Sequence, residues 1–131
     1  MRRWAASTPV HLAFAFLAMG AWAWWANRAH PTPEPQQAAL LQGALSACLT
    51  FYLKRVVEWI AARSVGHLAL WLPPAVALAG SASVLVVLHR LAGTPALLAT
   101  IAVPLLVSGS YVTLYNLTLW RTRRTRHGDE R

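Results

Sequence analysis

Charged residues are scarce in this chain, and acidic residues are the scarcest. Only 12% of the 131 residues are charged, with 4 Asp and Glu against 12 Lys and Arg, while 56% are hydrophobic. That composition is too apolar for an ordinary soluble domain of this length and predicts a membrane protein. The formal net charge is +8. Because no zinc-ligand spacing, ribonucleoprotein motif or basic recognition helix accompanies the positive charge, we expect no nucleic-acid binding.

Residues that carry chemistry are also few. The single cysteine, Cys48, excludes an intrachain disulfide, and its apolar surroundings predict a small, buried packing residue. The five histidines never recur at a spacing of three or four, so a helix-borne metal pair is not expected. The sequence has no nucleophile–base arrangement and no phosphate-binding glycine loop. We therefore expect no enzyme activity, no cofactor and no metal.

Long apolar segments dominate what is present. They predict an all-α polytopic membrane protein with four transmembrane helices in one domain, residues 1–131. The expected spans cover about 9–26, 36–60, 68–90 and 95–120, since about 20 apolar residues cross a bilayer, and a basic tail follows at 121–131. Pro31–Pro35 is expected as a non-helical loop, whereas Pro73-Pro74 either starts or kinks the third helix. Thr94-Pro95 resembles a cap-plus-proline start for the fourth.

The N-terminus allows a second interpretation. Arg2 and Arg3 precede the first apolar segment, and Ala21-Trp22-Ala23 mimics a small-x-small cleavage site, as in a secretory signal peptide. We interpret the segment as a retained transmembrane helix.

Basic residues set the expected orientation, because they concentrate on the cytoplasmic side of membrane proteins. With four spans, both termini share one side. That side would hold ten basic residues: Arg2, Arg3, Lys54, Arg55, Arg63, Arg121, Arg123, Arg124, Arg126 and Arg131. The other side would hold two, Arg28 and Arg90. Both termini are therefore predicted to be cytoplasmic, in a bacterial inner membrane.

Polar residues occupy every fourth position of the second segment: Gln42, Ser46, Thr50, Lys54 and Glu58. A step of four drifts by about 40° on a straight helix, so the first three fit within about 80° and share one face. That trio forms either helix-to-helix hydrogen bonds or a surface facing a solute or lipid headgroup. Lys54 and Glu58, with neighbouring Arg55, are expected at the interface, paired with each other or with headgroups.

Two further polar groups are candidate sites. Asn27, Arg28, His30 and Glu34 form a predicted outer-face cluster, either a solvated loop or a receiver for an anionic ligand or partner. The fourth segment carries Ser108, Ser110 and Asn116, and Asn116 inside a membrane needs a hydrogen-bond partner. Small residues form strips that permit close helix packing or self-association: Ala39, Gly43 and Ala47 on the second segment, and Ala75, Ala79 and Ser83 on the third.

Two functions from different classes fit these features. The first is a homo-oligomeric transport or lipid-translocation unit that uses the Gln42, Ser46 and Thr50 surface. The second is a non-catalytic accessory or scaffold subunit of a larger membrane complex. The small multidrug transporters match the chain in size and span count, but the only carboxylate in an expected span, Glu58, lies at its edge. Because a proton-coupled antiporter needs a membrane-embedded carboxylate, the chain departs from that family, and we assign it to none. The expected partners are anionic lipid headgroups at the basic tail and further membrane subunits.

Overall fold

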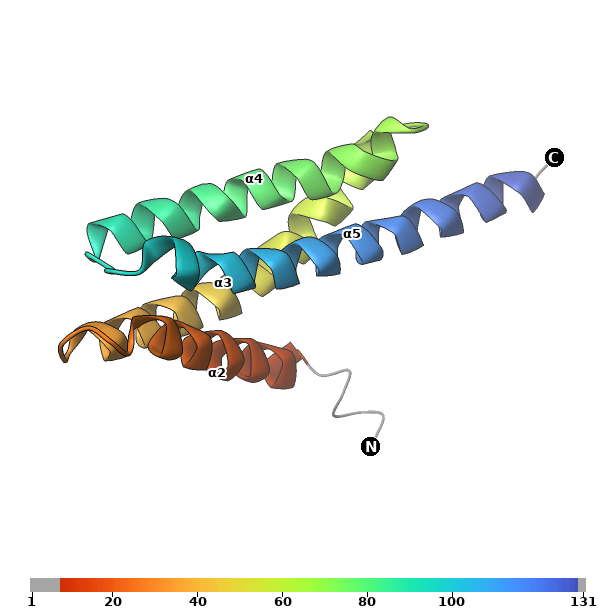
Figure 1. The fold of residues 1–131 in the computed structure, drawn as a ribbon. Coiled ribbons are helices and arrows are strands. Elements are labelled where there is room, and N and C mark those ends of the chain that lie inside the picture. The colour runs from red at the N-terminus through yellow and green to blue at the C-terminus, as the bar shows by residue number, and fades with distance from the viewer. Residues whose placement is uncertain (1–7, 130–131) are drawn as a thin grey trace.

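The computed structural model describes residues 8–129, and its regular structure is helical throughout. Four helices follow in order: α2 (Thr8–Asn27), α3 (Glu34–Arg63), α4 (Leu68–Leu91) and α5 (Leu97–Asp129). Successive helices run in opposite directions, so α2 begins at the end of the bundle where α5 finishes (Figure 1). α3 packs against all three other helices. The all-α class expected from the sequence is confirmed.

Three helices are long and apolar enough to cross a membrane, namely Pro9–Asn27, Leu68–Leu91 and Leu97–Asp129. Helices of this length and composition indicate a membrane protein. α3 is less apolar because it carries the polar residues at every fourth position, from Gln42 to Glu58. Its 30 residues nevertheless give a length of about 45 Å at about 1.5 Å per residue, more than a hydrocarbon core of about 30 Å.

Proline and glycine place the helix ends differently from two of our predictions. The expected loop Pro31–Pro35 is wrong at its last two residues, because α3 starts at Glu34 with Pro35 in its first turn. A proline there loses no helical hydrogen bond. The expected start at Thr94-Pro95 is also wrong, because α5 begins at Leu97. Gly93, with φ of +72°, ends α4 in the left-handed conformation that a helix C-terminus often takes.

The Pro73-Pro74 pair lies inside α4 rather than at its start. A proline has no N–H, so the carbonyls of Ala69 and Leu70, four residues earlier, lose their helical donors. Asn116 of α5 replaces both donors: its Nδ2 lies 3.0 Å from the Ala69 oxygen and 2.6 Å from the Leu70 oxygen. The expected partner of Asn116 is thus the backbone of α4. This contact fixes α4 against α5.

α2 and α3 approach closely at glycines, as the small-residue strip on α3 predicted. A Cβ added to Gly43 would lie 2.9 Å from the Phe16 carbonyl oxygen, and one added to Gly20 would lie 3.0 Å from that of Ala39. Both distances are too short for a side chain without movement of a helix. The strip on α4 behaves differently, because Ala75, Ala79 and Ser83 are exposed.

The interior is small, and large apolar side chains cover the outside. One core cluster joins Leu53 and Val57 to Ala77 and Val112, and another joins Leu49, Leu85 and Ile101. Outward-facing side chains include Phe14, Leu98 and Leu106, each more than two-thirds exposed. Cys48 is also exposed, which corrects the expectation of a buried thiol. An apolar exterior of this kind suits contact with lipid tails.

Candidate functional site

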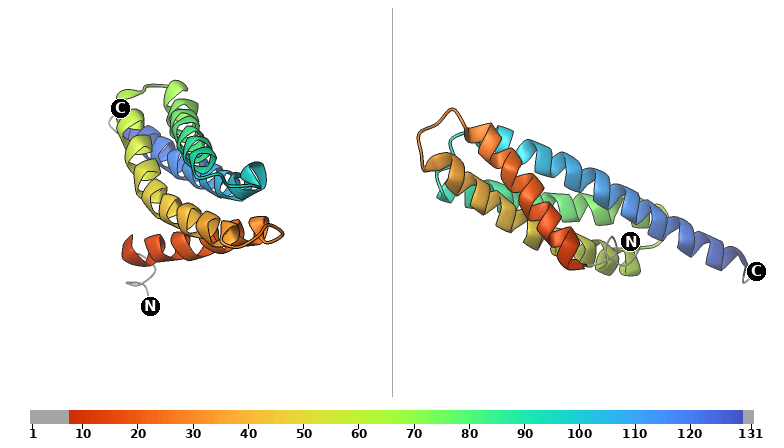
Figure 2. Two further views of the ribbon diagram at one scale, coloured as in Figure 1. Left: turned by 90° about the vertical axis from the view of Figure 1, so that its left-hand side faces the viewer. Right: turned by 90° about the horizontal axis from the view of Figure 1, so that it is seen from below.

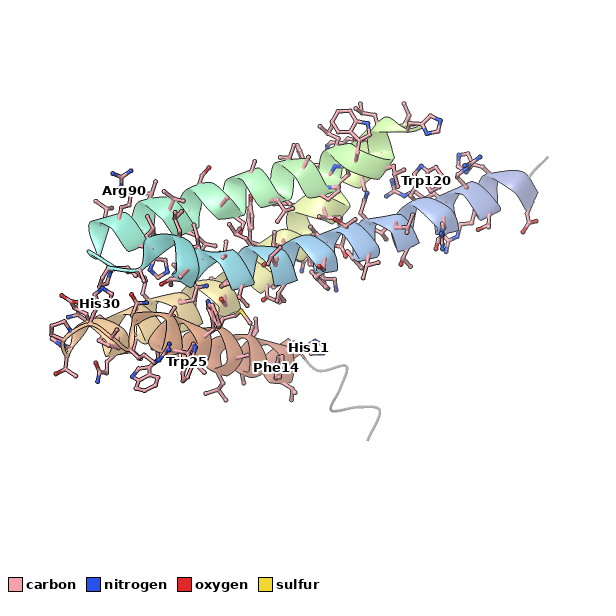
Figure 3. The ribbon with its side chains drawn as sticks, viewed as in Figure 1. His11, Phe14, Trp25, His30, Arg90 and Trp120 are labelled. Atoms are coloured by element: carbon pink, nitrogen blue, oxygen red, sulfur yellow. The ribbon has the colours of Figure 1, made fainter. Side chains whose placement is uncertain are left out.

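A cavity of about 380 Å³ lies between α2, α3 and α5. Its walls are mainly apolar side chains of the N-terminal half of α2 and the middle of α5, with α3 as its floor. The lining residues are His11, Phe14, Ala15, Ala18, Met19, Gln42, Ser46, Leu49, Thr50, Leu53, Leu85, Pro104, Val107, Ser108 and Tyr111. Figure 3 labels His11 and Phe14 on this half of α2.

α2 and α5 meet at one end and diverge toward the other (Figures 1 and 2), and the cavity lies in this wedge between the two helices. Where they meet, Trp22 Nε1 donates to the Ala99 carbonyl at 2.9 Å. Asn27 makes a second connection: its Nδ2 lies 2.8 Å from Thr100 Oγ1, and its Oδ1 accepts from the Ala96 N–H at 3.0 Å. These contacts close the end of the wedge near the 28–33 loop.

The structure brings all three residues of the predicted trio to the cavity. Gln42 is fully buried and its Nε2 donates to Ser46 Oγ at 2.8 Å. Thr50 donates to the backbone carbonyl of Ser46 at 2.7 Å. Gln42 also bonds across to α4, which is a helix-to-helix hydrogen bond of the kind that the first alternative expected. Gln42, Ser46 and Thr50 all border the cavity.

His89 is the partner of Gln42, and sequence reasoning missed it. It is fully buried, with Nε2 2.8 Å from Gln42 Oε1 and Nδ1 2.7 Å from Thr94 Oγ1. Because His89 is near the end of the third segment, its ring was expected at the membrane interface. The turn at Gly93 instead brings Thr94 back over His89, since the Thr94 N–H bonds the His89 carbonyl at 3.0 Å. A buried imidazole with both nitrogens bonded has a fixed orientation.

The polar residues of α5 separate into different roles. Ser108 is half-buried and lines the cavity, whereas Ser110 is exposed and donates to the Leu106 carbonyl at 2.9 Å. Asn116 lies away from the cavity, where it holds the proline turn of α4. Of the three predicted residues, only Ser108 belongs to this site.

The predicted outer-face cluster is divided by the fold. Asn27 is fully buried in the connection between α2 and α5, so its assignment to a solvated cluster is wrong. Arg28 turns back over the Trp25 ring, 3.6 Å from its centroid, and donates to the Trp25 carbonyl. His30 and Glu34 are half-buried. Figure 3 shows Trp25 and His30 near the loop end of α2.

The two residues predicted at the interface, Lys54 and Glu58, differ in their surroundings. Glu58 accepts a hydrogen bond from Tyr115 of α5, and Lys54 is exposed. Tyr115 stacks on Tyr111, with ring centroids 5.8 Å apart. The drift of a four-residue step explains the difference, because Glu58 turns toward α5 while Lys54 turns outward. Arg55 lies over the Phe51 ring at 5.1 Å.

A second hollow, of about 710 Å³, lies between the 64–67 loop and the basic end of α5. Arg123, Arg124 and His127 line it together with Trp120. Arg123 donates to the Ala61 carbonyl, and Arg124 lies over the Trp120 ring at 4.7 Å. The predicted tail is therefore a continuation of α5 as far as Asp129, with residues 130–131 outside the described part.

Within residues 8–129, no group of three or more His, Cys, Asp or Glu side chains is placed to hold a metal ion. Comparison of the chain with protein-family models, with curated proteins and with solved structures finds no match. The case for a function therefore depends on the geometry of the cavity.

Proposed function

We propose that this protein binds a lipid or lipophilic solute in the wedge-shaped cavity and moves it across a bacterial inner membrane as a homo-oligomeric unit. The observation that carries the proposal is the cavity itself, with polar groups on its α3 floor and apolar walls on α2 and α5. Its volume lies in the range of small-molecule sites, about 300–1,000 Å³. Polar side chains within membrane segments commonly mark such pathways.

The proposal includes four spans with both termini in the cytoplasm. α3 counts as the fourth span because it lies among the other three helices, where its polar side chains meet protein rather than lipid. Basic residues concentrate at the end where α5 finishes, which favours a cytoplasmic location for that end. The wedge then opens toward the cytoplasm, and the Trp22 and Asn27 contacts close its outer end.

Oligomerisation follows from the small size of the bundle. Four helices enclose little space, and the cavity is lined by only part of the length of α2 and of α5. A second copy would complete a path across the bilayer. The hollow at the basic end of α5 is a suitable contact for anionic lipid headgroups, at about 1 kcal/mol per basic residue.

Movement of a fluorescent lipid between the leaflets of reconstituted vesicles tests the proposal. We expect the wild-type protein to accelerate it, and the Ser46→Ala/Thr50→Val variant to slow it about thirtyfold, since two hydrogen-bonding groups of about 1 kcal/mol each are lost. Gln42 is retained because it bonds His89. Ser83→Ala, on the outer face of α4, is the matched control. Equal rates for wild type, variant and protein-free vesicles would refute the proposal.

A role as an accessory subunit is the second candidate. It is favoured by the exposed strip Ala75, Ala79 and Ser83, since small residues on an outer face allow another helix to approach closely. Mild-detergent extraction followed by mass measurement separates the candidates. A multiple of the 14.4 kDa chain supports the homo-oligomer, whereas a stoichiometric foreign subunit supports the accessory role.

A further inference from the structure

We infer that the cavity selects an uncharged lipid whose head carries hydrogen-bond acceptors, such as the ester carbonyl of an acylglycerol. The inference rests on the proposed function and names its ligand class. Three features carry it: the direction of a hydrogen-bond chain, the hydroxyl groups left without acceptors, and the charge of the lining.

The direction of the hydrogen-bond chain follows from the Gln42 amide, which turns its oxygen toward His89 and its nitrogen toward Ser46. An amide oxygen only accepts, so with Oε1 on this side His89 carries its proton on Nε2. In the neutral ring Nδ1 then accepts from the Thr94 hydroxyl. Gln42 Nε2 donates onward, so Ser46 Oγ receives a hydrogen bond. The Ser46 hydroxyl proton has no acceptor among residues 8–129, and Ser46 lines the cavity.

A second hydroxyl faces the same space. Ser83, Ser110, Thr118 and Thr122 each donate to the carbonyl four residues earlier, which is the usual local partner in a helix. Ser108 makes no such bond within the described chain, although it lies four residues after Pro104. Ser46 on the α3 floor and Ser108 on the α5 wall thus offer donors to the cavity. A ligand that accepts hydrogen bonds satisfies both.

The lining disfavours a charged head. None of the described lining residues is Lys, Arg, Asp or Glu. An ion moved into such surroundings without a partner loses hydration that two hydroxyl groups do not replace. The stacked Tyr111 and Tyr115 lead from the cavity to the Glu58 carboxylate, which disfavours a phosphate further. Phe14, Leu49 and Val107 supply apolar surface for a hydrocarbon chain.

Native mass spectrometry of the full chain with three single-chain lipids tests the inference. The probes share one acyl chain and differ in the head: a monoacylglycerol, a lysophosphatidic acid and a trimethylammonium amphiphile. We expect the monoacylglycerol to bind about tenfold more tightly than either ion. Ser46→Ala and Ser108→Ala should each weaken it about three- to tenfold, as expected for one lost hydrogen bond. The matched control Ser110→Ala should leave binding unchanged.

The outcomes separate this inference from the proposed function. Equal or tighter binding of either ionic probe overturns the ligand class but leaves the cavity as a binding site. A preference for the neutral probe that survives both serine variants overturns the assignment of donors. The Ala18→Phe variant, whose new side chain fills the cavity, should bind none of the probes, while its circular dichroism spectrum still shows a helical protein. Binding of no probe to wild type, or undiminished binding to Ala18→Phe, overturns the proposed function as well.

Discussion

At the scale of single residues, buried polar groups determine which helices meet. Gln42, His89 and Asn27 are all fully buried, and each bonds to a different helix or to the turn beyond its own. In an apolar bundle an unpaired polar group is costly, so such pairs specify one arrangement of the helices. The same pairs place Ser46 and Thr50 beside the cavity. Specificity of packing and formation of the site therefore depend on the same residues.

The Gln42–His89 bond is testable by a double-mutant cycle. Gln42→Leu and His89→Leu should each destabilise the protein by about 1–3 kcal/mol, because each leaves the other side chain buried without its partner. The double variant should cost less than the sum, with coupling of at least about 0.5 kcal/mol. Unfolding by SDS, followed by circular dichroism in mixed micelles, measures all four proteins. Strict additivity would show that the two side chains do not depend on each other.

At the scale of the helices, prolines and glycines explain most of the geometry. The proline pair of α4 is tolerated because Asn116 of α5 bonds the two carbonyls that the prolines leave without donors. The glycines of α2 and α3 permit the close approach of these helices.

The compensation by Asn116 predicts a dependence on the prolines. Asn116→Leu should destabilise the wild-type protein by about 1–3 kcal/mol, because the Ala69 and Leu70 carbonyls lose their donor. The cost should fall in a Pro73→Ala/Pro74→Ala background, where backbone N–H groups bond the same carbonyls. The same unfolding measurement applies, with Thr118→Val on the exposed face of α5 as the control. An equal cost in both backgrounds would contradict this account.

The α2–α3 contact predicts opposite effects for two glycines. Gly43→Ala should destabilise by about 1–3 kcal/mol through overpacking, because its Cβ would meet a backbone oxygen at 2.9 Å. Gly109→Ala should be neutral or stabilising, by up to about 1 kcal/mol, since its Cβ would meet only the Leu78 side chain at 3.4 Å and alanine favours helix. Thermal unfolding compares the two variants. A more stable Gly43→Ala protein would show that α2 and α3 are not closely packed there.

For the whole molecule, sequence and structure agree on what local patterns determine. Apolar length predicted helices, and helical periodicity placed Gln42, Ser46 and Thr50 together. Contacts between residues far apart in the sequence could not be predicted from local patterns. The partner of Gln42 is 47 residues away, and that of Asn27 is 73 residues away. The hydrogen bond that Glu58 accepts from Tyr115, 57 residues away, was not predicted for the same reason.

The proposed four-span topology makes a whole-molecule prediction. In a Cys48→Ala background, cysteines introduced at Ala29 and Ala92 should react with a membrane-impermeant maleimide added to intact spheroplasts. Cysteines at Gly66 and His127 should react only after permeabilisation, because the proposed cytoplasmic side holds those positions. Labelling of Gly66 from outside would contradict four spans. Labelling of His127 from outside would contradict the orientation.

The central claim is that the wedge between α2, α3 and α5 holds an uncharged lipid, and its most direct test is methyl NMR of the purified protein. The chain has 2 methionines, and Met19 lines the cavity. Met19→Leu assigns the two signals. Titration with a monoacylglycerol should shift the Met19 methyl resonance saturably in wild type and leave it unmoved in Ala18→Phe. A Met19 signal that does not respond, or that responds equally in both proteins, would contradict the account.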